Sequence, residues 1–442
     1  MKKILSLWLL FSLTGYSQAQ ENTFSLQQAI DYALKNHTSV LNAQLDEDIA
    51  RKKVNEIVGL GTPQIEGTAD FNYFLDIPVS FVPGEFFGGE PGTYAPVQFG
   101  QKYSASAGVN ISQLLFDGSY LVGLQATKTY QDLSRKQTKQ TKTETAVNVS
   151  KAYYGALVSN ARMEIIDANL NRVEKMLGEI KVLNQNGFVE KLDVDRMELT
   201  YNNLLVEKEK VKRYQTISYA LLKFQMSYPS TQPIELSDKL EAATIQEVSI
   251  PESVNLANRP EYQVMDVTKR LQELDVKRYK MTFVPSLVAF GAFSFNNSRN
   301  EFDFLDTDLR WFPTSIIGAK LSVPLWDGMQ KSARVSQAKL NLKKVENSIT
   351  LMKNGFELEM ESAKTNYLNN TASLAIVKKN RELALEIARV SKVKYDNGIG
   401  SSLEVVDAES SLREADANYL NTLYETIIAR IDLDKASGNL NY

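Results

Sequence analysis

The sequence contains no cysteine and a single histidine. The missing cysteine excludes disulfide bonds, thiolate metal sites and cysteine nucleophiles. One histidine is too few for a histidine cluster that holds a metal, and it removes most histidine-based catalysis. Lys and Arg (50) nearly balance Asp and Glu (53), so the net charge of −3 provides no basic surface for nucleic acid. We therefore predict no catalytic residue, no cofactor, no metal site and no nucleic-acid partner.

Long hydrophobic runs are also missing. After the N-terminus no stretch has 18 or more consecutive apolar residues, so the sequence predicts no transmembrane helix. Residues 1–19 have the features of a secretory signal peptide: two lysines at the start, an apolar segment over residues 4–13 and small residues before the cleavage site. This pattern predicts an exported chain that can enter a membrane only through strands or an interface.

Two motifs occur twice in the chain, about 210 residues apart. Phe116-Asp117-Gly118 recurs as Trp326-Asp327-Gly328, and Asn186-Gly187 recurs as Asn397-Gly398. Small solenoid repeats have periods of roughly 20–50 residues, so a period of this length indicates one large unit that has been duplicated.

The duplication suggests a division of the mature chain. We predict a first structural repeat over residues 20–228, a linker and equatorial region over residues 229–257, and a second repeat over residues 258–442. The first copy contains about 12 extra residues before its Asp-Gly motif. They are rich in glycine and proline, so we predict that they form a loop.

Four segments alternate apolar and polar side chains over about ten residues each. They lie at about residues 62–76, 101–115, 284–298 and 312–325. Such two-faced strands are typical of outer-membrane barrels, and ordinary half-buried hairpins give the same alternation. Aromatic residues beside these segments predict interfacial girdles or loop packing, with a plain core as the alternative; they include Phe71, Phe81, Phe86, Phe87, Tyr94, Tyr103, Phe302, Phe304 and Trp311.

Two very long helices are predicted, at about residues 119–185 and 329–396. Neither segment contains proline, and a continuous helix of this length extends about 100 Å. A compact domain does not accommodate such helices, so they require coiled-coil partners. The predicted fold class is mixed α and β, with four strands and two very long helices built from an internal duplication.

The number of strands implies an oligomer. A bacterial barrel needs at least about eight strands, because an open sheet edge leaves unpaired backbone groups in hydrocarbon. One chain provides four. Counting strands alone allows two, three or four protomers.

These features together resemble the TolC outer-membrane efflux family, over essentially the whole mature chain. The resemblance rests on the signal peptide, the duplicated plan, the Asp-Gly strand exits, and the turn at residues 398–408, which reads Gly-Ile-Gly-Ser-Ser-Leu-Glu-Val-Val-Asp-Ala. It implies a homotrimer with a 12-stranded membrane β-barrel shared between protomers, four strands each, continued by a long periplasmic α-helical coiled-coil barrel of 12 helices. It also implies an outer-membrane channel of a tripartite efflux or type I secretion system.

The resemblance implies partners as well. They are a periplasmic adaptor (membrane fusion) protein, an inner-membrane pump of the RND, ABC or MFS type, and outer-membrane lipid. The expected location is the outer membrane of a Gram-negative bacterium, with the helices extending into the periplasm.

The resemblance also implies a gate at the periplasmic tip. Its acidic positions match Glu404 and Asp407, the repeat-related Asp193 falls on the acidic position of the first hairpin, and Tyr395 falls on a hydrogen-bonding tyrosine. The chain departs from the family at Gly400, where a basic residue is common, so a gate salt bridge does not carry over. Rings of these acids would favour cations.

The same residues also suit ordinary helix starts. Ser401 and Glu404 have the spacing of a capping box, and acids in a first helical turn are favoured by the helix dipole. A structural role for these acids therefore stays open on the sequence alone.

Two other classes of protein were weighed. A secreted or periplasmic coiled-coil scaffold without a pore would have the same long helices. A carboxylate-based hydrolase would need two acids converging in a cleft, which long two-faced helices do not offer. His37, between Asn36 and Thr38, is predicted to be a solvated loop residue.

Overall fold

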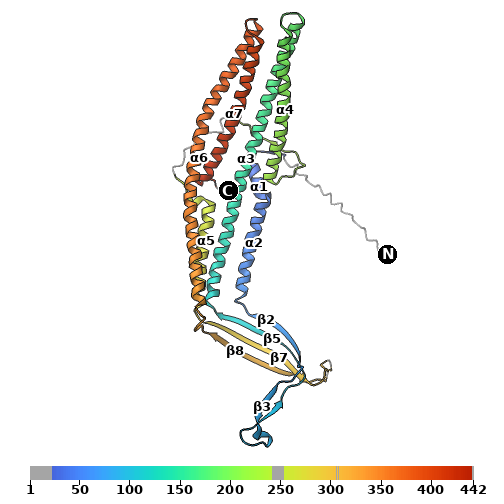
Figure 1. Ribbon diagram of the computed structural model, residues 1–442, viewed down its shortest axis with the longest axis vertical. Coiled ribbons are helices and arrows are strands. Elements are labelled where there is room, and N and C mark those ends of the chain that lie inside the picture. Colours follow the sequence, from blue (N-terminus) through green and yellow to red (C-terminus); the bar gives the residue numbers. More distant parts are fainter. Residues whose placement is uncertain (1–21, 241–252, 305, 307, 441–442) are drawn as a thin grey trace, which may run out of the picture. The chain divides into compact units, whose positions relative to one another are not determined.

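The computed structural model describes residues 22–240, 253–304, 306 and 308–440 (Figure 1). The predicted signal peptide lies outside these residues, as does part of the predicted linker. The first half of the chain contains β1 (Thr23–Phe24), α1 (Leu26–Asn36), α2 (Thr38–Gly59), β2 (Gln64–Tyr73), β3 (Val79–Pro83), η1 (Gly84–Phe87), β4 (Tyr94–Gln98), β5 (Tyr103–Phe116), α3 (Gly118–Gln185) and α4 (Lys191–Met226). The second half contains β6 (Glu235–Leu236), η3 (Leu256–Asn258), α5 (Pro260–Met281), β7 (Ser286–Arg299), β8 (Phe312–Ser322), α6 (Gln330–Asp396) and α7 (Ser402–Ser437).

The chain forms two compact units. Unit 1 comprises the described parts of residues 1–42, 139–259 and 355–442, and unit 2 comprises residues 43–138 and 260–354. Each unit draws on both sequence repeats, because the long helices α3 and α6 pass from unit 2 into unit 1. No helix in the described part of the chain is long and apolar enough to cross a membrane.

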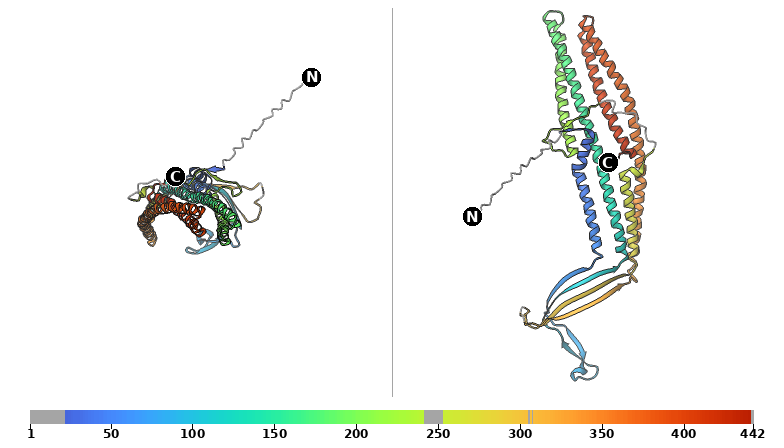
Figure 2. Two further views of the ribbon diagram at one scale, coloured as in Figure 1. Left: turned by 90° about the horizontal axis from the view of Figure 1, so that it is seen from above. Right: turned by 180° about the vertical axis from the view of Figure 1, so that it is seen from behind.

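Unit 2 contains one four-stranded antiparallel sheet with the order β2-β5-β7-β8 (Figures 1 and 2). The strands lie at the predicted places, and β5 and β7 each end one residue beyond the predicted segment. The mixed α and β fold with four long strands and two very long helices is therefore confirmed. The central pairing, β5 with β7, joins a strand of the first repeat to a strand of the second.

The register places apolar side chains on one face of this sheet. Ile65 lies opposite Ile111, which lies opposite Gly291, which in turn lies opposite Ile317. The other face is mostly polar near β2 and β5, because side chains alternate along each strand; its members there include Gln64, Glu66, Thr68, Asp70, Asn72, Ser104, Ser106 and Asn110. The apolar face is open to solvent in the single chain, and Ile317 is 90% exposed.

The insertion between β2 and β5 forms a second, smaller sheet. The sequence predicted a loop here because of its glycines and prolines. Instead, β3 and β4 pair antiparallel, with Phe81 opposite Pro96 and Pro83 opposite Tyr94, and η1 closes the turn. Proline is compatible with both strands because each lies at the edge of a two-stranded sheet.

Short helices flank the long ones within unit 2. The Thr138 hydroxyl of α3 donates to the Ala43 carbonyl of α2 at 3.1 Å. On α5, Lys269 lies 3.7 Å from Glu346 of α6, and Arg270 lies 3.2 Å from Asp132 of α3. These contacts place α2 and α5 beside the long helices, as the sequence required of helices with coiled-coil partners.

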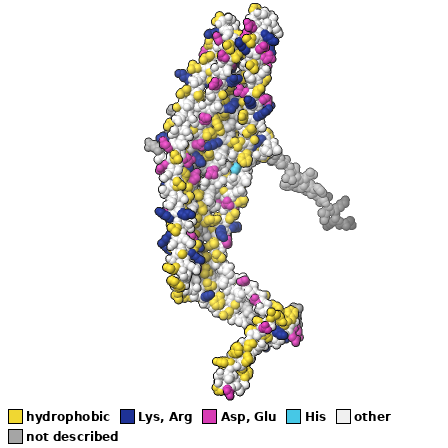
Figure 3. Space-filling model, viewed as in Figure 1, with side chains coloured by type: hydrophobic (Ala, Val, Ile, Leu, Met, Phe, Trp, Pro, Cys, Tyr) yellow, Lys and Arg dark blue, Asp and Glu magenta, His cyan; other side chains and the backbone are white. Residues whose placement is uncertain are grey.

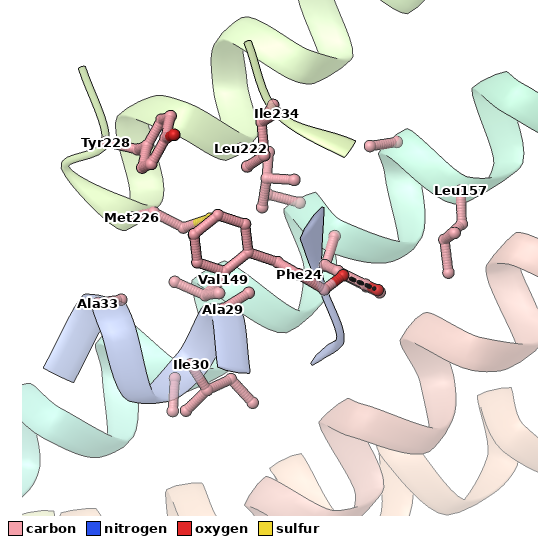
Figure 4. Packing of buried hydrophobic residues seen from close by; sticks show 14 residues of the cluster. Phe24, Ala29, Ile30, Ala33, Val149, Leu157, Leu222, Met226, Tyr228 and Ile234 are labelled. Atoms are coloured by element: carbon pink, nitrogen blue, oxygen red, sulfur yellow. Dashed lines mark hydrogen bonds between the residues drawn. The ribbon is translucent and has the colours of Figure 1, made fainter. Parts of the chain in front are cut away.

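The main core of unit 1 lies where α1, α3 and α4 meet (Figure 4). Phe24 of β1 packs there with Ile30, Leu222 and Met226, all buried. The Tyr153 hydroxyl donates to the Phe24 carbonyl at 2.9 Å, and β1 pairs in parallel with β6. Burial and the nearby Asp238 carboxylate raise the pKa of Tyr153 well above its usual value. This core fixes the start of the described chain against the long helix.

Candidate gating site at the ends of the helix hairpins

Two helix hairpins end in turns built from the same chemistry. Asn186 and Asn397 each donate a side-chain N–H to the carbonyl four residues earlier, at 2.9 and 2.7 Å. The next residues, Gly187 and Gly398, have φ of 78° and 73°, a left-handed conformation that glycine adopts without strain. The duplicated Asn-Gly motif therefore ends α3 and α6 and reverses the chain into α4 and α7.

Glu404 and Asp407 lie in the first turns of α7, and both side chains are exposed. The Ser401 hydroxyl accepts the Glu404 backbone N–H at 3.2 Å. The full reciprocal box forms at α1, where Ser25 and Gln28 bond in both directions, but at α7 the structure shows this one bond. Among the described residues no basic side chain pairs with Glu404 or Asp407. Both carboxylates therefore face solvent as free negative charges.

Asp193 has a different environment. It lies in the first turn of α4, is half-buried, and accepts a hydrogen bond from the Ser402 hydroxyl of α7. Arg196, one turn further along α4, approaches it to 3.8 Å. Asp193 thus connects the first hairpin to the second, whereas its repeat-related Glu404 is free.

Tyr395 packs on a buried cluster that includes Met197 and Val405. Burial raises the pKa of its hydroxyl, and the carboxylates of Asp193 and Asp396 raise it further. In the described part of the chain its hydroxyl has no hydrogen-bond partner. The hydrogen-bonding role that the resemblance implied for this tyrosine stays a prediction.

Gly400 occupies a tight turn. Its backbone N–H donates to the Lys394 carbonyl at 3.1 Å, and a Cβ added at this position would lie 3.0 Å from both the Tyr395 nitrogen and the Lys394 Cβ. A basic side chain at this position would therefore require the turn to shift.

Sequence reasoning missed two buried ion pairs on α7. Glu409, 7% exposed, receives the Arg172 guanidinium of α3, with Nε at 2.9 Å from Oε1 and Nη2 at 2.9 Å from Oε2. One heptad later, Asp416 accepts from Arg381 of α6 at 2.7 Å. The sequence did contain a signal: between Val405 and Leu423 the buried positions of α7 are apolar except for these two acids.

A third ion pair joins the long helices α3 and α6. Lys392 of α6 lies 3.0 Å from Glu179 of α3 and 3.3 Å from Asp396. Burial lowers its pKa, but the hydrogen bonds to the two carboxylates outweigh this effect, so the pKa of Lys392 is raised. Lys392 therefore stays protonated and holds α3 and α6 together near the turns.

Among the described residues no three His, Asp or Glu side chains group as metal ligands. The arrangement therefore consists of free acids at the start of α7, with buried and half-buried polar contacts linking the two hairpins.

Comparison with known proteins identifies the family. The sequence profile of the outer membrane efflux protein family matches residues 29–226 and 253–439. The outer membrane protein TolC of Vibrio cholerae is 22% identical over 448 residues, which cover 100% of this chain and 96% of that protein. The TolC protein of Escherichia coli is 20% identical, with coverage of 100% and 87%.

Solved structures share the fold. The MtrE outer membrane channel of Neisseria gonorrhoeae superposes with a TM-score of 0.74 at 17% identity, covering 93% of this chain and 88% of that one. These matches confirm the predicted resemblance and the predicted location. The chain belongs to the outer membrane efflux protein family, a family of channel proteins rather than enzymes, located in the outer membrane of Gram-negative bacteria.

Proposed function

We propose that the protein is the outer-membrane exit duct of a tripartite efflux or type I secretion system and conducts substrates passively from the periplasm to the outside. The observation that carries this proposal is the four-stranded sheet. One of its faces is apolar and exposed, the opposite face is largely polar, and its edge strands β2 and β8 pair with no further strand among the described residues. In lipid such edges need partners, so copies of the chain must complete the wall.

A homotrimer suits both the strands and the helices. Three copies provide twelve strands, well above the minimum for a barrel. The helices also leave apolar stripes uncovered in the single chain. On α4 these are Ile217, Leu221 and Phe224, at spacings of four and three, and on α6 they are Ile376 and Leu383, one heptad apart. Stripes at these spacings pack against neighbouring helices, which supports a tunnel of twelve helices.

The free acids support a gate at the periplasmic end. Three copies of Glu404 and Asp407 around one axis create a strongly negative ring that favours cations over anions. Asp193 and Tyr395 contribute differently: Asp193 links the two hairpins through Ser402, and Tyr395 packs beneath the turn. Opening requires the hairpins to move apart, and partner contacts bias that equilibrium.

The turns themselves support docking of a periplasmic adaptor, through which an inner-membrane pump would act. Phe188 and Ile399 occupy equivalent places in the two turns, and they are 77% and 79% exposed. Leu192 and Leu403 are a second equivalent pair, and both are exposed. Exposed apolar residues at a helix-hairpin end suit contact with an amphipathic helix of another protein.

Ion conduction tests the duct. Purified protein in detergent should appear as a threefold particle by electron microscopy and should conduct ions in planar bilayers. The rival hypothesis, a periplasmic coiled-coil scaffold, predicts a water-soluble protein that conducts nothing. A monomer that is stable without detergent would overturn the proposal.

Reversal potentials in a salt gradient test the gate. Glu404→Gln combined with Asp407→Asn should reduce the cation preference, because the negative ring is removed without changing side-chain size. Glu425→Gln is the matched control. Glu425 is exposed on the same helix but about 30 Å further along, beyond the screening length of physiological salt. An unchanged reversal potential in the double variant would remove the gate role.

A further inference from the structure

The β3–β4 hairpin is a built element, although its sequence looks like a loop. It leaves the sheet where Phe74 donates its N–H to the Lys102 carbonyl at 2.8 Å. At its far end Gly84 donates to the Thr93 carbonyl at 2.7 Å, and a Cβ on Gly84 would collide with the Thr93 hydroxyl oxygen at 2.3 Å. Gly88, with φ of 80°, ends η1. Specific glycines and hydrogen bonds thus shape the hairpin end.

Hydrophobic side chains gather on the surface of this hairpin (Figure 3), and four of them are exposed aromatic rings. The exposed rings are Phe81 at 71%, Phe86 at 79%, Phe87 at 62% and Tyr94 at 69%. Together they present about 500 Å² of apolar surface, which equals the largest apolar patch of a typical soluble monomer, and such patches are often functional. Phe81 and Tyr94 lie on the same hairpin face, because each pairs across the strands with a proline of that face.

The other loop at the same end of the sheet behaves differently. Its rings contact rings at the strand ends. The ring centroid of Phe302 lies 5.6 Å from that of Phe71 and 5.9 Å from that of Tyr103, and the centroids of Phe304 and Trp311 are 6.2 Å apart. In the described part of the chain no ring contact involves the four aromatic residues of the hairpin. The rings of this loop therefore contact rings at the strand ends, although Phe302 itself is 63% exposed. The four hairpin rings make no such contact among the described residues and are open to a second molecule.

Charge disfavours a lipid surface as that molecule. Between residues 77 and 101 the charged residues are Glu85 and Glu90, both acidic. Anionic headgroups would repel this segment, and interfacial anchors normally carry lysine or arginine beside their aromatic residues. An identical hairpin is a better match, because apolar faces of the same kind can cover one another.

The β3–β4 hairpin is long enough for identical copies to meet at the axis of the barrel. A twelve-stranded barrel with strands 4.8 Å apart and tilted by about 40° is about 75 Å around, with a radius of about 12 Å. Each strand of the hairpin has five residues and extends about 16 Å before η1 is added. From any point on the rim, the hairpin is long enough to reach the axis.

We propose that the β3–β4 hairpins of three copies meet over the outer mouth of the channel and bury their aromatic faces against one another. This assembly forms an outer constriction at the mouth of the barrel, and it rests on the trimer proposed above. Glu85 and Glu90 of the three copies repel each other weakly in salt, which keeps the constriction openable. Substrate leaving the duct must part the hairpins.

Disulfide trapping tests this proposal cleanly, because the chain has no cysteine of its own. In the full-length trimer, Phe86→Cys should give covalent dimers on oxidation, since a disulfide requires Cα atoms within about 7 Å. Val109→Cys is the control. Val109 lies on β5 within the wall, so its copies are four strands, or about 19 Å, apart and should not cross-link.

Conductance provides the second measurement. Replacing residues 78–99 by a short Gly-Ser linker should raise the single-channel conductance, whereas the Val109→Cys channel should conduct like the parent. Channels that are trimeric and conducting, yet show no Phe86→Cys dimers and no conductance change, would overturn the outer constriction and leave the duct intact. A parent protein that neither trimerises nor conducts would overturn the duct instead. A third outcome is a Phe86→Cys channel whose cysteines neither cross-link nor react with a water-soluble maleimide. This outcome would show that the rings lie in lipid, and it too would overturn the proposal.

Discussion

Replacing Arg172 by methionine should loosen the contact between α3 and α7. Glu409 is buried and accepts three hydrogen bonds from the Arg172 guanidinium, at 2.9 to 3.0 Å. Methionine keeps much of the apolar stem but leaves the carboxylate without its cation. Removing one partner of a buried pair costs about 3–5 kcal/mol, and we expect about 3 kcal/mol because Arg172 is itself 31% exposed.

Hydrogen exchange measures this loss locally. A local opening free energy that is lower by about 3 kcal/mol corresponds to about 150-fold faster amide exchange around Glu409. Arg413→Met is the matched control on the same helix, because its partner Glu207 lies 3.9 Å away and both side chains are partly exposed. Such a pair contributes at most about 1 kcal/mol, or roughly fivefold in exchange.

A double variant separates the charge from the packing. Arg172→Met combined with Glu409→Leu should recover most of the protection, because no charge remains buried. If Arg172→Met alone accelerates exchange by less than about fivefold, Glu409 is not a buried charge that depends on its cation, and the reasoning is refuted.

Two further predictions concern helix ends. Burial lowers the pKa of His37, and its Nδ1 accepts the Ser39 N–H at 3.2 Å at the start of α2. As the pH falls through 6.5, the unfolded chain binds a proton at this histidine before the folded chain does. The stability that this site contributes is therefore present above that pH and is lost below it. The one histidine gives a single signal in a [13C]histidine NMR titration, which should show a pKa below 6.5, and His37→Asn should keep the acceptor and abolish this pH dependence of amide exchange in α2. Ser401→Ala should cost about 1 kcal/mol in the first turn of α7 by removing the acceptor of the Glu404 N–H, whereas Ser401→Gly should cost only a few tenths. Exchange at the first α7 amides distinguishes the two, and equal effects would contradict the capping role.

The predicted elements agree closely with the structure where the signal is local. The long helix predicted at 119–185 is Gly118–Gln185, and the one predicted at 329–396 is Gln330–Asp396. Both ends are set by residues beside them, an Asp-Gly motif at the start and an Asn-Gly motif at the end. The two faces of the sheet follow from alternation along each strand, which needs no knowledge of the partner strand.

Two predictions that were made from the local sequence differ in part from the structure. The insertion was predicted as a loop because glycine and proline usually interrupt structure. Its glycines do lie between the strands, in η1 and the turn, but Pro83 and Pro96 are accommodated in β3 and β4, a hairpin that has only edges. His37 was predicted to be a solvated loop residue. It does lie outside both helices, between α1 and α2, but it is half-buried and its ring nitrogen accepts the Ser39 N–H at the start of α2.

By itself the sequence determined the absence of thiol and histidine-cluster chemistry, the duplicated plan, the two-faced strands, the long helices and the turns between them, because each depends on residues a few positions apart. The tertiary structure alone decided which distant residues meet. It brought Arg172 to Glu409 across 237 positions and Ser402 to Asp193 across 209, and left Glu404 and Asp407 unpaired. Such pairings depend on how helices and strands pack against one another, and the spacing of residues along the chain does not determine which residues packing brings into contact.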